Sequence, residues 1–250
     1  MPQFEHDQIV PFQGSELNKK QQVSDMFNRI AYRYDFLNHF LSGGADIWWR
    51  KRAIRELRDL KGANILDVAT GTADMAIMMA KELSANQITG IDISEGMLEI
   101  GRNKILHLGL EKKISLQAGD SEAMEFPDAS FDAITVAFGV RNFENLMRGL
   151  LEMRRVLKPG GKLIILEFSK PKAGVFKQLY RFYLGVIAPA VVQLFSKRQA
   201  YEYLNKTVQS FPEGASLLAI LRDAGFPAAL AKPLSFGICS VYVGSKPAFT

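Results

Sequence analysis

The chain contains a single cysteine, three histidines and no hydrophobic run long enough to cross a membrane. The one cysteine, Cys239, excludes an internal disulfide and fits a reducing cytoplasm, where we expect it to be buried and inert. The longest apolar stretch, residues 183–195, is shorter than the ~20 residues of a spanning helix and contains Pro189. No cluster of His and Cys has the spacing of a metal site, and no secretory signal precedes residue 20. We therefore expect a cytoplasmic protein that binds no metal.

The dinucleotide-binding fingerprint G-x-G-x-x-G is also absent. Residues 64–80, NILDVATGTADMAIMMA, nevertheless have the order of a nucleotide site: an apolar run, a loop carrying Gly71 and a new apolar pattern. A pyrophosphate needs closely spaced glycines, but this loop has one glycine with Asp67 and Asp74 on either side. Two carboxylates repel phosphates and attract cations. The pattern therefore disfavours a dinucleotide-dependent oxidoreductase.

The overall composition is that of an ordinary globular protein. The 250 residues are 48% hydrophobic and 23% charged, with a formal net charge of +5. Such a chain can form one large domain with a full core. The small positive charge is compatible with nucleic acid, anionic lipid or an anionic substrate, so it does not decide between these partners.

Strand-like and helix-like patterns alternate in the middle of the chain. We expect strands at 63–68, 87–92, 114–118, 132–138 and 162–168, with helices at about 74–84, 95–108 and 144–157. Such alternation is typical of β-α-β units with a parallel sheet. The C-terminal residues predict two further strands around a loop at 233–236. We therefore predict an α/β fold with a mostly parallel seven-stranded sheet, one antiparallel strand and helices on both faces.

The whole chain, residues 1–250, is expected to form one domain with five parts. In the second part, Val23, Met26, Phe27 and Ile30 have helical spacing, and a turn-rich patch at 32–46 is expected to separate this helix from one at about 48–60. The parts are a flexible arm (1–17), an N-terminal helical cap (18–60), a cofactor-binding core (61–170), a helical lid on the acceptor side (171–212), and a last helix with a terminal hairpin (213–250).

Polar residues follow three consecutive predicted strands. In an open α/β sheet, ligands bind beyond the carboxyl ends of the strands. Asp92 ends the second strand and can accept both hydroxyls of a ribose, while Asp120 and Ser121 follow the third and can read an adenine. Gly71 allows the backbone to approach a ligand, and Thr72 adds a hydroxyl near a helix N-terminus.

These features predict S-adenosylmethionine as the cofactor. That molecule carries a ribose, an adenine, an ammonium and a sulfonium, and both cations suit the carboxylates of Asp67 and Asp74. The alternative for any single strand-terminal aspartate is that it caps the next helix. Three strand-terminal aspartates in order, Asp67, Asp92 and Asp120, with a glycine loop after the first, favour the cofactor site.

Three stretches resemble motifs of the ubiquinone/menaquinone-biosynthesis C-methyltransferases: YDFLNHFLSGGADIWW (34–49), AFGVRNF (137–143) and RVLKPGGKLIILEFSKP (155–171). The resemblance extends from about residue 22 onward. It implies the class I methyltransferase, Rossmann-like fold and S-adenosylmethionine-dependent methylation of a ring carbon of a prenylated quinol. Carried over position by position, it also assigns cofactor contacts to Thr72, Asp92, Asp120 and Ser121.

This sequence departs from that family pattern at two places. Asp46 stands where the family usually has a histidine, and the cofactor loop reads TGTAD instead of GGTGD. The loop is more similar to that of members serving menaquinone alone, which favours demethylmenaquinol as the acceptor. A dual enzyme that also methylates a prenylated benzoquinol is the alternative.

The resemblance also indicates the residues that act on the acceptor. Arg141 is expected to stabilise the quinolate oxygen, Asn142 to orient a water or a ring hydroxyl, and Tyr34 to line the quinol pocket. The alternative for Arg141 is an ion pair with Glu144 at a helix start. His39 is a candidate base, although a lone histidine beside apolar residues is more often structural.

The predicted partners are the prenylated quinol and, transiently, a membrane surface. Residues 176–204 are apolar with basic flanks, as in a packed helical pair or in a lid over a prenyl tail that touches anionic lipid on the inner face of the membrane. A homodimer is left open. We expect no nucleic acid, because AFGVRNF is not an Asn/Asp-Pro-Pro-aromatic motif for a flipped base. An RNA methyltransferase and a non-catalytic cofactor-binding module are the remaining alternatives.

Overall fold

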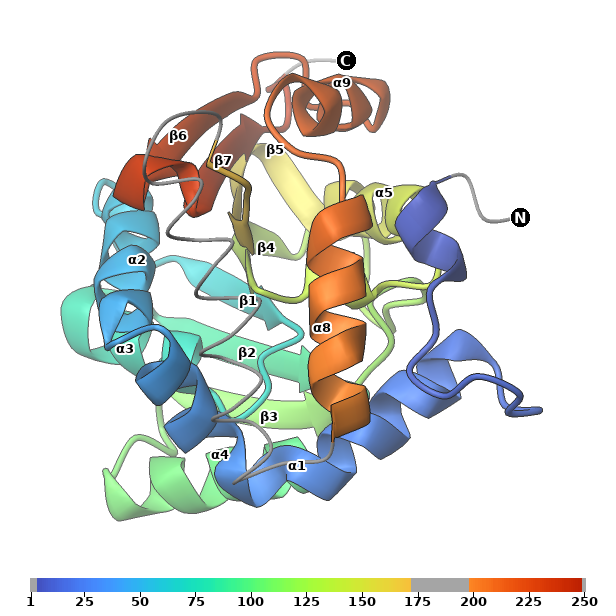
Figure 1. Cartoon of the computed structure of the whole chain (residues 1–250). Helices are drawn as coiled ribbons and strands as arrows, with labels where there is room; N and C mark the ends of the chain where they lie inside the picture. The colour runs from blue at the N-terminus through green and yellow to red at the C-terminus, as the bar shows by residue number, and fades with distance from the viewer. Residues whose placement is uncertain (1–3, 172–197, 249–250) are drawn as a thin grey trace.

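The computed structural model describes residues 4–171 and 198–248 (Figure 1). Its centre is one seven-stranded sheet with the strand order β3-β2-β1-β4-β5-β7-β6. Only β7 runs antiparallel to its neighbours, as predicted from the sequence. The strands are β1 (Asn64–Val68), β2 (Gln87–Asp92), β3 (Ile114–Ala118), β4 (Phe131–Ala137), β5 (Leu157–Phe168), β6 (Leu230–Leu234) and β7 (Cys239–Ser245).

Strand order reverses between β1 and β4, and this reversal positions the site. The chain moves outward from β1 to β2 and β3, then returns to pair β4 with β1 on the other side. Loops that leave β1 and β4 therefore diverge at their carboxyl ends, which opens a crevice there. The buried runs Ile65–Val68 and Ala133–Val136 keep these two strands in the centre of the molecule.

Helices cover both faces of the sheet and create two hydrophobic cores. On one face, α2 (Ala45–Ile54) and α3 (Asp74–Glu82) bury residues such as Ala53 and Met79 against the strands. On the other face, α5 (Leu146–Val156) and α9 (Ala215–Asp223) bury Leu150 and Leu217. The described residues also form the helices α4 (Glu95–His107) and α8 (Arg198–Ser210).

The N-terminal cap differs from the sequence-based expectation. Helix α1 (Lys19–Leu41) runs without a break through most of the patch expected to form turns, and α2 begins only after Gly43 and Gly44. The reason is local: residues 32–41 contain no glycine or proline, so the first break comes where both glycines adopt positive φ. A short 3-10 turn, η2 (Arg55–Leu57), extends α2.

Part of the expected flexible arm is packed against the domain. Residues Glu5–Gln8 form a 3-10 turn, η1, in which His6 and Asp7 are buried. The ammonium of Lys19 donates a hydrogen bond to the backbone oxygen of His6 at 2.6 Å, and the His6 ring meets Phe211 edge-on. The lid predicted at 171–212 is described only at residue 171 and from residue 198 onward. Within the described residues, no helix is long and apolar enough to cross a membrane.

Candidate active site

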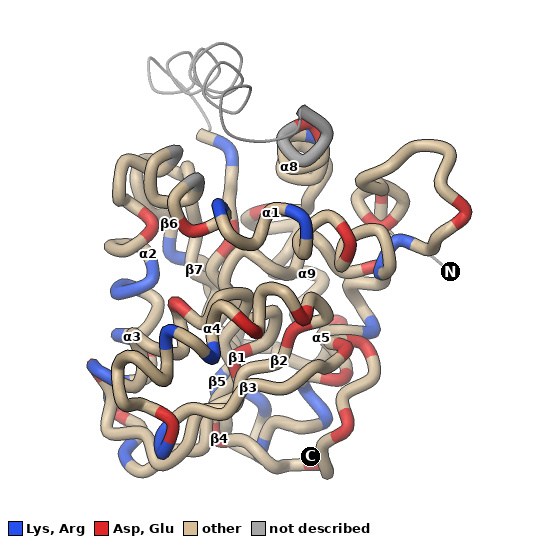
Figure 2. The backbone as a smooth tube through the Cα atoms, turned by 90° about the horizontal axis from the view of Figure 1, so that it is seen from below, with Lys and Arg blue, Asp and Glu red and all other residues tan. Residues whose placement is uncertain are grey.

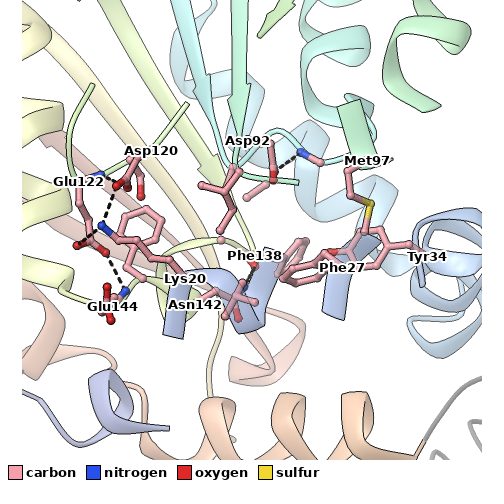
Figure 3. A pocket seen from close by; sticks show the side chains of 18 residues that line it. Lys20, Phe27, Tyr34, Asp92, Met97, Asp120, Glu122, Phe138, Asn142 and Glu144 are labelled. Carbon is pink, nitrogen blue, oxygen red and sulfur yellow. Dashed lines mark hydrogen bonds and ion pairs between the residues drawn. The ribbon is translucent and has the colours of Figure 1, made fainter. Parts of the chain in front are cut away.

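A cavity of about 600 Å³, open to solvent, lies at the carboxyl ends of the central strands beneath helix α1 (Figure 3). It brings together most of the residues that the sequence singles out for cofactor and acceptor. Those that line it are Tyr34, Gly71, Asp92, Asp120, Ser121 and Asn142.

Asp92, the last residue of β2, points its carboxylate at the mouth of the β1 loop. One oxygen accepts the backbone N–H of Gly71 at 2.8 Å and the other accepts that of Ser94 at 2.9 Å. Burial raises the pKa of Asp92, and backbone hydrogen bonds from Ser94, Gly71 and Ile93 partly oppose this shift. Each oxygen keeps a further lone pair. The carboxylate is thus fixed in position and can accept two adjacent hydroxyls, as a ribose requires.

The loop after β1 presents bare backbone to the cavity. Ala69, Gly71 and Ala73 all adopt positive φ, so the chain alternates between left-handed and ordinary conformations. A Cβ built on Gly71 would meet no atom within 4 Å, and both Ala69 and Gly71 line the cavity. The loop therefore leaves open space next to Asp92 that a ligand can fill.

Asp120 lies at one end of the cavity with Lys20 beside it (Figure 3), and Ser121 also lines the cavity. The ammonium of Lys20 lies 2.7 Å from Asp120 and 3.0 Å from Glu122. The other oxygen of Asp120 accepts the backbone N–H of Glu122, which fixes the carboxylate. Sequence reasoning missed Lys20 and Glu122, because nothing local marks a helix residue as the partner of a loop 100 residues away.

Helix α1 forms a wall of the cavity and is tied to it at several points. Val23, Phe27 and Tyr34 line the space with apolar and aromatic surface. Ser24 donates a hydrogen bond to the backbone oxygen of Ile93 at 2.9 Å, and the Asn28 side chain accepts the N–H of Gly96 at 2.9 Å. The cap is therefore part of the binding site.

Two of the predicted cofactor residues lie outside the cavity. Asp67 is buried and accepts hydrogen bonds from the hydroxyls of Thr70 at 2.7 Å and Thr135 at 2.6 Å. Burial raises its pKa to about 6. Thr72 donates to Asp35 of α1 at 2.5 Å and accepts a hydrogen bond from Lys104 at 3.1 Å. Both residues hold the loop after β1 in place: Asp67 through its contacts with Thr70 and Thr135, and Thr72 through its contacts with Asp35 and Lys104.

Arg141 lies behind the lining of the cavity, next to Asn142 on the short turn η3 (Val140–Asn142). Only 4% of its surface is exposed, and its Nη1 donates to the backbone oxygen of Phe138 at 2.6 Å and to Glu167 at 2.7 Å. The alternative partner Glu144 does not make this ion pair. Asn142, next in the chain, lines the cavity together with Phe138.

Tyr34 and His39 occupy different sides of α1. Tyr34 lines the cavity and meets Phe27 edge-on, and burial raises the pKa of its hydroxyl. His39 does not line it; its Nδ1 lies 2.8 Å from the carboxylate of Asp46. Although burial opposes it, hydrogen bonds from Ser42 and His39 lower the pKa of Asp46. A histidine thus adjoins the position where the family usually carries one.

Two solved structures with the same architecture are named as methyltransferases. A methyltransferase of this kind from Thermotoga maritima has a TM-score of 0.61 at 18% identity and covers 89% of this chain and 98% of its own. Phosphoethanolamine N-methyltransferase 2 of Haemonchus contortus, solved with S-adenosylhomocysteine, has a TM-score of 0.63 at 16% identity, over 90% of this chain and 60% of its own. The fold is that of a class I methyltransferase. The chain also matches a methyltransferase family model over residues 15–246, so the protein is an S-adenosylmethionine-dependent methyltransferase.

The chain belongs to the ubiE/COQ5 methyltransferase family, whose model matches residues 15–246. The demethylmenaquinone methyltransferase of Bacteroides fragilis is 44% identical over 97% of this chain and 99% of its own length. The ubiquinone/menaquinone biosynthesis C-methyltransferase UbiE of Geobacter sulfurreducens is 42% identical over 91% of this chain and 90% of its own. The resemblance seen in the three sequence motifs is thereby confirmed.

Proposed function

We propose that the protein methylates a ring carbon of a prenylated quinol, and that its acceptor is demethylmenaquinol. The observation that carries the proposal is that one cavity joins strand-end carboxylates suited to the donor with Tyr34, Phe138 and Asn142 on the acceptor side. The Bacteroides fragilis relative, named for demethylmenaquinone, supports the naphthoquinol ring. The TGTAD loop favours the same choice.

When bound, S-adenosylmethionine supplies an electrophilic methyl group on its sulfonium. In our proposal Asp92 holds the ribose, Asp120 and Ser121 hold the adenine, and the Gly71 loop lets the backbone approach. Asp67 and Thr72 support the loop from behind. These roles follow from the carboxylate and backbone positions described above, and all of them concern binding and orientation.

The chain's contribution to the chemistry is to make the acceptor ring more nucleophilic. An aromatic carbon reacts poorly until a ring hydroxyl loses its proton, and the guanidinium of Arg141 favours that anion. The Oδ1 of Asn142 has no hydrogen-bond partner among the described residues and can accept a hydrogen bond from a hydroxyl or a water. Tyr34 and Phe138 line the cavity with aromatic surface, against which an acceptor ring can pack.

A prenylated acceptor also requires a route for its apolar tail. The rings of Tyr32, Phe40 and Trp48 are exposed on α1 and α2, with Arg52 over the Trp48 ring at 5.8 Å. Aromatic residues next to cations suit the interface of an anionic membrane. This surface supports the proposed peripheral membrane contact. The expected role of residues 176–197 as a lid rests on their sequence alone, because they lie outside the described residues.

The main alternatives are a dual enzyme and an RNA methyltransferase. The Geobacter sulfurreducens relative, named for both quinones, supports the dual reading. An RNA substrate is disfavoured, because α1 and α4 each carry both basic and acidic residues and are not purely basic helices (Figure 2).

The experiment that tests the proposal offers labelled S-adenosylmethionine with reduced demethylmenaquinone and, in parallel, with the demethylated benzoquinol, both in detergent. We expect label in the naphthoquinol alone. Label in both acceptors would make the protein a dual enzyme. Label in neither, with donor binding confirmed by calorimetry, would contradict the proposed acceptor, and RNA would be offered next.

A further inference from the structure

Glu167 is a carboxylate buried in the centre of the sheet. It is the penultimate residue of β5, pairs in register with Ser240 of β7 and has no exposed surface. Its Oε1 accepts hydrogen bonds from Arg141 at 2.7 Å and from the backbone N–H of Phe168 at 2.9 Å. A buried charge is costly unless it is paired. Retention of a glutamate here therefore calls for a reason beyond packing.

Arg141 is the ion-pair partner of Glu167 among the described residues, and several atoms around the pair are incompletely satisfied. Arg141 also packs its guanidinium over the Phe168 ring at 5.4 Å. Oε2 of Glu167, Nε of Arg141 and Oδ1 of Asn142 are buried without a hydrogen-bond partner in the described part of the chain. Buried polar atoms normally have partners, so this cluster is incomplete without a further group. Of these three atoms, only Oδ1 of Asn142 belongs to a residue that lines the cavity, and it can accept a hydrogen bond from a ring hydroxyl there.

We propose that Glu167 is a positioning residue for the reaction: it anchors Arg141 beside Asn142, and its negative charge limits the positive potential that the acceptor hydroxyl experiences. The inference rests on the proposed function, because it takes the acceptor to be a hydroxylated aromatic ring. Glu167 acts through Arg141, since it does not line the cavity itself. The charge pair thus tunes the pH at which the acceptor ionises.

Other titratable groups face this pair from the neighbouring elements. The Arg141 charge acts on the hydroxyls of two tyrosines, and the Glu167 charge acts on two side chains of β7, each of which has its pKa raised chiefly by burial. The two tyrosines are Tyr34 and Tyr203, and the two side chains of β7 are Cys239 and Tyr242. The charge of Arg50, on α2, also acts on Tyr34 and Cys239. Glu167 is the carboxylate in direct contact with Arg141, so its removal changes the local charge most.

The test compares Glu167→Gln with Glu167→Asp in the full-length protein. Gln keeps an oxygen that accepts a hydrogen bond from Arg141 but removes the negative charge. The positive potential at the acceptor hydroxyl then rises and the hydroxyl ionises more easily. The acidic limb of the pH profile of kcat should therefore move about one pH unit lower. KM for the quinol should stay within about threefold, because the ring's binding surface is unchanged. Asp keeps the charge but shortens the side chain, so it should retain the wild-type pH midpoint and lower kcat.

A second readout does not depend on turnover. The absorbance of 1-naphthol reports its ionisation, and the probe should ionise at a lower pH when bound to the wild type than when free, and lower again when bound to Glu167→Gln. If the wild type methylates no quinol while this titration shifts as expected, the proposed function fails and the role of Glu167 stands. Equal midpoints for free and bound probe in both proteins would overturn it.

The control is Glu152→Gln, which removes the charge of another arginine-paired glutamate, on α5. Glu152 lies 2.8 Å from Arg155 and does not line the cavity. Its pH profile should match the wild type. Affinity for S-adenosylmethionine, measured by calorimetry, reports whether each variant is folded. The inference is wrong if Glu167→Gln loses activity with an unchanged pH midpoint, or if Glu167→Asp shifts the midpoint as far as Gln does.

Discussion

Lys20 and Asp120 are 100 residues apart in the chain, yet the ammonium of one lies 2.7 Å from the carboxylate of the other (Figure 3). The contact spans the space between helix α1 and the loop after β3. Both side chains are about a third exposed or less, so the pair adds little to folding stability. Its consequence is local: Lys20 fixes the orientation of the carboxylate that we assign to the adenine.

Lys20→Met should therefore weaken binding of S-adenosylmethionine by about three- to tenfold, with little change in melting temperature, because an exposed pair contributes less than about 1 kcal/mol. Calorimetry measures the affinity. Lys158→Met is the matched control, since Lys158 lies 2.8 Å from Asp132 with comparable exposure but outside the cavity. Equal losses of affinity in both variants would show that Lys20 has no specific role.

Asp92→Ala should abolish measurable donor binding. The substitution removes the acceptor for the ribose and also leaves the N–H groups of Gly71 and Ser94 without their partner, at about 1–3 kcal/mol each if they stay dry. Calorimetry and thermal melting separate the two effects. Asp132→Ala, which likewise removes an acceptor for a backbone N–H, should lower stability without changing donor affinity. Unchanged affinity in Asp92→Ala would contradict the cofactor assignment.

Arg141→Ala should lower kcat more than tenfold while donor affinity holds, because Arg141 is placed to act on the acceptor. It should also cost about 3–5 kcal/mol of stability, since Glu167 loses its buried partner. The double variant Arg141→Ala/Glu167→Gln should recover most of that stability without recovering turnover. Urea unfolding and steady-state kinetics on the three proteins check this. A parallel loss of donor affinity would argue against the role.

His6 should make the stability depend on pH. Burial, which outweighs the attraction of Asp7, lowers its pKa from 6.5 to about 4. The unfolded chain therefore binds an extra proton between pH 6.5 and 4, so this contribution is complete above pH 6.5 and is lost as the pH falls toward 4. The loss can reach about 3 kcal/mol.

Urea unfolding at pH 7 and at pH 4.5 measures this effect. The wild type should lose more stability across the interval than His6→Leu, which cannot take up the proton. His39→Gln is the control, because His39 is partly exposed. Equal losses in the wild type and His6→Leu would mean that the packed arm opens before His6 titrates.

Strand ends were predictable from sequence because they follow a local pattern. Asp92 ends one predicted strand and Asp120 closely follows the next. Because the strands are parallel, their carboxyl ends meet at one edge of the sheet, and both aspartates are therefore expected at that edge. The continuous helix through Tyr34 and Asn38 differs from the turn-rich patch expected there, because polar and aromatic residues do not end a helix that no glycine interrupts. Helix-breaking backbone, and not polarity, decided the end of α1.

Contacts between distant segments could not be predicted in the same way. The partner of Arg141 is Glu167, 26 residues away, whereas sequence reasoning considered Glu144, three residues away. Similarly, Thr72 bonds to Asp35 of α1, and Lys20 reaches Asp120. Such pairs depend on which strand lies beside which and on how the cap crosses the sheet. One sequence contains both residues of each pair but not the geometry that joins them.

Helix α1 is attached to the loops after three neighbouring strands: to the first through Asp35, to the second through Ser24 and Asn28, and to the third through Lys20. Any route past this wall, for the donor entering or the spent donor leaving, requires some of these attachments to break. When the donor exchanges by that route, the free energy of breaking them enters the catalytic cycle. Strengthening the helix contacts would hold the donor longer and slow its replacement, so tight retention and fast turnover oppose each other in this protein.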